Sequence, residues 1–126
     1  MQIANEENIK IDFFPMKRLK ALAIPHSIAI NPNKIKTNRE LKEALAHELG
    51  HHKRNAFYTI HSSLETRERQ EERATRWAVD ALVPAEEIKK ALKKGYVELW
   101  PLADYFDVSE EFMADAIRVH RLKGKI

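Results

Sequence analysis

The sequence has no cysteine, and this absence limits both its covalent and its metal chemistry. Disulfide bonds cannot form, and any bound metal ion has to be held by histidine and carboxylate side chains. No apolar run approaches the roughly 20 residues of a membrane-spanning helix. The first residues also lack the apolar region of a secretory signal. We therefore expect a cytoplasmic protein that has no membrane partner.

The remaining composition is that of a soluble globular protein, with 44% hydrophobic and 33% charged residues. A chain of 126 residues is long enough for one modest core. We expect a single domain over residues 1–126, with its core at about 19–84 and C-terminal helices at about 85–122.

The formal net charge is +3, and a cluster near the C-terminus contributes to it: Arg118, Arg121, Lys123 and Lys125. A solvated helix end explains such a cluster, because cations are favourable near a helix C-terminus. Binding of nucleic acid by the C-terminal helices is the alternative, and strong salt dependence would be its signature. We expect no direct contact with nucleic acid.

The distribution of apolar residues and turn formers predicts a little β-structure followed mainly by helices. The polar stretch 1–10 is either a short strand or a poorly ordered arm. Strands at 18–24 and 27–30 form a hairpin around Pro25-His26, so His26 is a surface turn residue. Capping residues and prolines place helices at about 38–53, 64–82, 84–94, 100–106 and 109–122. The expected class is α+β, with a small antiparallel sheet packed on a mostly helical domain.

One stretch in the first helix carries the pattern H-E-x-x-H, formed by His47, Glu48 and His51. Residues four apart lie on one face of a helix, so both imidazoles can reach the same metal ion, and zinc is the usual occupant. Glu48 then lies beside the open coordination position, where a carboxylate can accept a proton from water. Gly50 is costly inside a helix and indicates close backbone packing there.

Zinc in hydrolases usually takes three protein ligands, and the third is a carboxylate of the second helix in our interpretation. The small-residue stripe Ala74, Ala78, Ala81 and Leu82 leads back to Glu71, which favours Glu71 as the ligand. Glu72 and Glu68 are the alternatives. Glu72 also faces Arg76 four residues on, as an ordinary surface pair.

Several polar residues are candidates for supporting roles. Tyr58 and His61, after the first helix, could each donate a hydrogen bond to a developing oxyanion, or be plain loop residues. Thr75, one turn after Glu71, could support a metal ligand. His52 and His120 are better explained by packing.

Together these residues resemble the ImmA/IrrE family of zincin-type metallo-endopeptidases. The matching stretches are Leu45 to His51, Glu71-x-x-Ala74-Thr75-x-Trp77-Ala78, and Leu82-Val83-Pro84, with a weaker match at Leu102 to Ser109. Thr75 stands where the family usually has Asn or Asp.

The resemblance implies a zinc endopeptidase with His47, His51 and Glu71 as ligands and Glu48 as general base. It also implies a protein substrate, a DNA-binding repressor of a phage or mobile element. The strand 27–30 would be the edge that pairs with an extended peptide. The alternative function is a metal-stabilised module that binds a regulator without cutting it.

Overall fold

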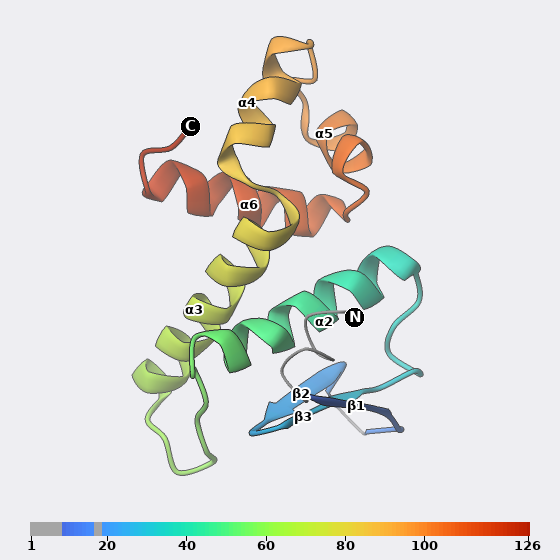
Figure 1. Cartoon of the computed structure of the whole chain (residues 1–126), viewed down its shortest axis with the longest axis vertical. Helices are drawn as coiled ribbons and strands as arrows, with labels where there is room; N and C mark the ends of the chain where they lie inside the picture. Colours follow the sequence, from blue (N-terminus) through green and yellow to red (C-terminus); the bar gives the residue numbers. More distant parts are fainter. Residues whose placement is uncertain (1–8, 17–18) are drawn as a thin grey trace.

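The computed structural model describes residues 9–16 and 19–126, and this part of the chain is α+β, as expected (Figure 1). The expectations for residues 1–8 and for a strand start at Arg18 lie outside the described residues. No described helix combines the length and apolar character that crossing a membrane requires. The elements are β1 (Lys10–Phe13), β2 (Ala21–Ile24), β3 (Ser27–Ile30), α2 (Asn38–Lys53), α3 (Leu64–Leu82), α4 (Ala85–Lys93), α5 (Leu99–Phe106) and α6 (Glu110–Leu122).

The sheet has the strand order β1-β3-β2 and is mixed rather than wholly antiparallel. The predicted hairpin of β2 and β3 is present, and His26 occupies its turn with a positive φ of 67°. β1 runs parallel to β3 along its other side, so β3 is the central strand. The expectation that strand 27–30 is a free edge is therefore wrong, and β2 is the edge strand next to it.

Helix α2 covers the sheet, and its start and end agree with the sequence. Thr37 caps it by accepting a hydrogen bond from the Glu40 N–H at 3.1 Å. Leu41, Leu45 and Leu49 pack against Ile28 and Ile30 of β3, which are fully buried. This burial fixes which face of α2 is turned away from the sheet.

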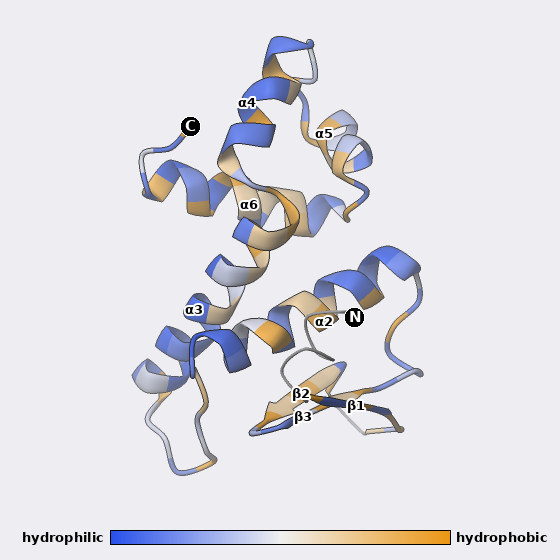
Figure 2. Ribbon diagram, in the orientation of Figure 1, coloured by the Kyte–Doolittle hydropathy of each residue, from blue (hydrophilic) through white to orange (hydrophobic). Residues whose placement is uncertain are grey.

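Helix α3 crosses α2 and connects the sheet region with the C-terminal helices (Figure 1). Hydrophilic colours dominate its first half and hydrophobic colours its second half (Figure 2). The second half joins a separate apolar cluster, in which Val79 and Val83 contact residues of α4, α5 and α6. Of the expected small-residue stripe, Ala74 and Ala78 are buried, whereas Ala81 is exposed.

The two long helices touch through their backbones at Gly50, as its position in the sequence predicts. A Cβ atom built on Gly50 would lie 2.6 Å from the carbonyl oxygen of Ala74 and 3.0 Å from its Cα. Only glycine allows this approach. The contact holds the HExxH helix and the Glu71 helix at a fixed separation.

Side chains on the face of α2 that is turned away from the sheet bind the C-terminal helices. Arg39 donates to Asp104 and Asp107 at 3.0 and 2.8 Å, and Glu43 accepts from the backbone N–H and hydroxyl of Ser109 at 2.5 and 2.9 Å. His120 is fully buried and donates to the Val83 carbonyl at 2.7 Å, which confirms its structural interpretation.

Candidate metal centre

Three side chains from the two long helices converge on one point. His47 and His51 lie one turn apart on α2, and Glu71 approaches them from α3. One ligand atom from each residue lies within 4.8 Å of the others. His47 Nε2 is 2.6 Å from Glu71 Oε2, and His51 Nε2 is 3.3 Å from Glu71 Oε1. The structure thus brings together the three residues that the sequence suggested as ligands.

Both imidazoles are oriented by hydrogen bonds at their other ring nitrogen. His51 Nδ1 donates to the Ala56 carbonyl at 2.5 Å, so its Nε2 faces Glu71. Thr75 Oγ1 lies 3.5 Å from His47 Nδ1. Such outer hydrogen bonds fix the tautomer and ring orientation of metal-ligating histidines. The Ala56 carbonyl gives no signal in the sequence, because any residue could supply it.

The donor set fits a divalent metal ion of the zinc type, with two imidazole nitrogens and one carboxylate oxygen. His47 Nε2 and Glu71 Oε2 lie at hydrogen-bond distance, and a bound metal would take the place of this direct contact. Burial favours a higher pKa for Glu71, but hydrogen bonds from His47, His51 and Tyr58 outweigh burial and hold that pKa well below its usual value. The carboxylate is therefore ionised and available.

Glu48 lies beside these ligands but points into a more enclosed environment, being 8% exposed. Burial raises the pKa of its carboxyl above the ordinary value, and the nearby histidines only partly oppose this effect. A carboxylate with a raised pKa is a better proton acceptor. This environment suits a general base.

A cavity of about 240 Å³ opens beside the centre, and Glu48, His51 and Glu71 form its inner wall. Tyr58 lies at its border and donates to Glu71 Oε1 at 2.7 Å. Burial and this hydrogen bond raise the pKa of Tyr58 to about 12, so its hydroxyl remains a donor. Residues 21–23 of β2 also line this cavity, and no motif in the sequence pointed to them.

The other candidates lie elsewhere. Glu72 points to the far side of α3, where it accepts two hydrogen bonds from Arg118 at 2.9 Å. Arg76 also contacts Glu72 at 3.4 Å, which confirms the expected pair of these two residues. Glu68 and His61 are exposed. Neither residue lines either of the two cavities that border the centre in the described part of the chain. His52 contacts the Ser27 carbonyl at 3.1 Å and thus joins α2 to β3.

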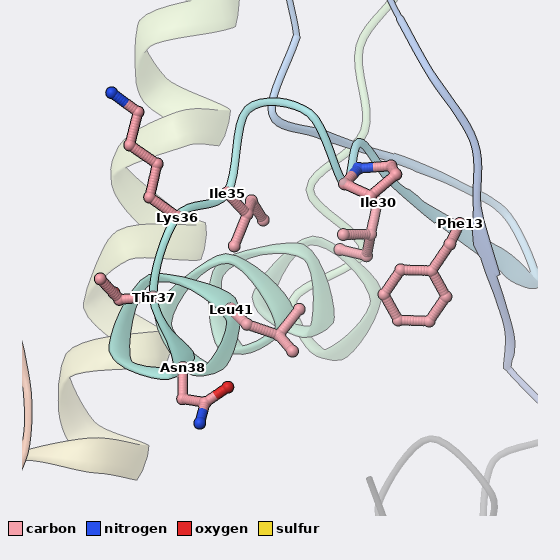
Figure 3. A pocket seen from close by; sticks show the side chains of 8 residues that line it. Phe13, Ile30, Ile35, Lys36, Thr37, Asn38 and Leu41 are labelled. Carbon is pink, nitrogen blue, oxygen red and sulfur yellow. The ribbon is translucent and has the colours of Figure 1, made fainter.

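A larger hollow, of about 460 Å³, lies away from this chemistry at the beginning of α2 (Figure 3). Phe13, Ile30 and Leu41 face it, whereas Lys36 directs its ammonium group outward. It contains none of the ligands or Glu48. The smaller cavity beside Glu48 is the one that adjoins the candidate metal centre.

Comparison with known proteins supports this assignment. A family model, Peptidase_M78, described as IrrE N-terminal-like domain, matches residues 4–118. The match includes His47, His51 and Glu71 and extends beyond the stretches that the motifs covered. No curated protein matches the chain significantly.

Proposed function

The chain belongs to the Peptidase_M78 family of metallopeptidases, and on that premise we propose that it is a zinc-dependent endopeptidase that cuts a regulatory protein. The observation that carries this proposal is the convergence of His47, His51 and Glu71 beside the buried Glu48. A purely structural metal site would need no base at that position. The intact Glu48 therefore favours a hydrolase over a binding module.

In the proposed reaction, His47, His51 and Glu71 would hold a metal ion, which would supply Lewis-acid polarisation of the scissile carbonyl and of the attacking water. Glu48 accepts the proton of that water and delivers it to the leaving amine. While the water attacks, and before the amine leaves, Tyr58 shifts its hydrogen bond from Glu71 to the oxyanion that develops on the carbonyl. Thr75 keeps His47 in its orientation through the ring nitrogen that faces away from Glu71.

The substrate peptide would pair with β2. Within the described residues β2 pairs with β3 alone, so its other edge is free. Asn31 N–H donates to the Lys20 carbonyl at 2.8 Å, and in the alternating antiparallel pattern the backbone groups of Ala21 and Ala23 therefore face away from β3. They line the cavity next to Glu48, where they can bind an extended peptide.

We assign the substrate to the class of DNA-binding repressors of phages or mobile elements, as the family resemblance implies. The second candidate function is a metal-stabilised module that binds such a repressor without cutting it. The three ligands, of which His51 is buried and His47 and Glu71 are half-buried, would serve either function, so Glu48 has to be tested directly.

The decisive experiment combines metal content with cleavage. Elemental mass spectrometry of the purified protein should find about one zinc per chain, since the three ligands form one site. Glu48→Gln should keep this zinc and lose peptide cleavage. Zinc binding without any cleavage by the wild type, together with an unchanged biological effect of Glu48→Gln, would support the binding module instead.

A further inference from the structure

A second cavity, of about 290 Å³, adjoins the metal centre on the side that faces α6. His47 and Thr75 are part of its wall, whereas Glu48, His51 and Glu71 line the first cavity. Because His47 Nε2 lies 2.6 Å from Glu71 Oε2, both cavities border the candidate metal centre, from different sides.

The edge strand passes both cavities. Lys20, just before β2, lines the second cavity, and residues 21–23 line the first. A peptide paired with this edge therefore places side chains from the two sides of its scissile bond next to different cavities. This step rests on the proposed peptidase function.

The walls of the second cavity suit a long, positively charged side chain. Ala44 and Phe112 offer an apolar surface against which the aliphatic stem of lysine or arginine can pack. Beyond them the wall carries four carboxylates and one ammonium group: Glu40, Glu43, Glu111 and Asp115, with Lys20.

These carboxylates differ in what already binds them. Glu43 is occupied by Ser109, and Asp115 has only a 3.5 Å contact with Arg118. The Glu111 side chain makes no hydrogen bond or ion pair with the described residues. Glu111 and Asp115 lie on one face of α6, four residues apart, and are the groups that a ligand can engage without breaking the fold.

We propose that this cavity binds a lysine or arginine side chain of the substrate and thereby selects peptides with a basic residue on the α6 side of the scissile bond. Glu111 and Asp115 determine this specificity, and Phe112 supports the aliphatic part of the side chain. The first cavity, bordered by Ala21 and Ala23, receives the opposite side of the peptide.

Cleavage specificity tests the proposal. The zinc-loaded wild type is incubated with an equimolar pool of synthetic peptides of varied sequence, and mass spectrometry identifies the cut bonds. Lysine and arginine should be enriched about tenfold at one fixed position, as expected for a charge-assisted hydrogen bond. The double variant Glu111→Gln/Asp115→Asn should lose this enrichment. Glu110→Gln is the matched control, because Glu110 is exposed on the same helix but does not line the cavity.

Cleavage without basic enrichment, or enrichment that survives in the double variant, would overturn the specificity proposal and leave the peptidase intact. If the pool is not cut at all, the peptidase proposal fails in this assay. The preference of the cavity for basic side chains is then tested by peptide binding. Fluorescence anisotropy then compares an arginine-rich with a glutamate-rich labelled peptide on the zinc-loaded Glu48→Gln variant. A preference for the arginine peptide that the double variant abolishes supports a basic-peptide cavity, and equal binding refutes it.

Discussion

Replacing Gly50 by alanine tests whether the backbone contact between α2 and α3 sets the geometry of the metal centre. In an ordinary helix this substitution stabilises by about 1 kcal/mol, because alanine is the better helix former. Here the new Cβ would lie 2.6 Å from the Ala74 carbonyl oxygen, closer than real Cβ atoms come to other atoms. The obstacle is backbone, so no side-chain rotation can remove it.

Relief requires the two helices to move apart. Overpacking of this kind costs about 1–3 kcal/mol, and a backbone obstacle belongs at the upper end. After subtraction of the gain in helix propensity, we expect a net loss of about 2 kcal/mol. For a chain of 126 residues, this lowers the melting temperature by about 6–10 °C.

The same displacement should weaken metal binding, because ligand distances in a metal site tolerate changes of only about 0.2 Å. His47 and His51 would move with α2 and Glu71 with α3. We expect zinc affinity to fall about tenfold or more. Thermal unfolding followed by circular dichroism and competition with a fluorescent zinc chelator measure the two effects.

The double variant Gly50→Ala/Ala74→Gly serves as the control. It removes the side chain of Ala74 but leaves its carbonyl oxygen, so it should not restore stability. If Gly50→Ala is as stable as the wild type and binds zinc equally well, the helices separate at no cost and the reasoning is refuted.

Three further predictions concern single side chains. Glu71→Gln should reduce the zinc content to near zero while Glu72→Gln retains about one zinc per chain, because only Glu71 faces the histidines; equal zinc in both variants would contradict the ligand assignment. Tyr58→Phe should retain zinc but lower kcat/KM for peptide cleavage by about 10²-fold, the typical effect of losing an oxyanion donor; an unchanged rate would remove Tyr58 from the mechanism. Arg39 lowers the pKa of Asp107 in the folded state. The pair therefore stabilises the fold fully at pH values above the unfolded carboxyl pKa of about 3.9, and this stabilisation is lost as the pH falls through the lower folded pKa. The urea midpoint of Asp107→Asn should therefore lie below that of the wild type at pH 6 and converge with it in acid, and high salt should shrink the difference, since the pair is exposed.

Local sequence signals predicted the helices and the three side chains that converge between α2 and α3, because short-range chemistry determines both. Thr37, Ser63 and Ser109 each cap a helix close to the start that the sequence predicted. The HExxH spacing places two histidines on one helix face wherever that helix packs. Choosing Glu71 over Glu72 also depended only on which face of α3 carries small residues.

The strand order could not be obtained in this way, because it depends on contacts far apart in the chain. Both β2 and β3 consist almost wholly of apolar residues, yet Leu22 and Ile24 of β2 are exposed and Ile28 and Ile30 of β3 are buried. Which strand is central was decided by the parallel addition of β1. That addition also left β2, not β3, as the edge beside Glu48.

The C-terminal helices bear on the remaining alternative, a nucleic-acid binder. In a helix-turn-helix protein, the first residues of the second helix enter the major groove. Here α5 and α6 meet at a tight turn, but the first turn of α6 carries Glu110 and Glu111, which repel phosphates. Its N-terminus is also bound by Glu43 of the metal helix.

Two of the basic residues at the end of α6 form ion pairs with carboxylates of α3. Arg118 pairs with Glu72, and Lys123 pairs with Asp80 at 3.2 Å. Their charges hold α6 against α3 and are partly neutralised there. Because Glu43 lies one turn before His47, the bond to Ser109 ties the position of α6 to that of the metal ligands. Under the proposed function, this unit supplies the α6 wall of the second cavity beside the candidate metal centre.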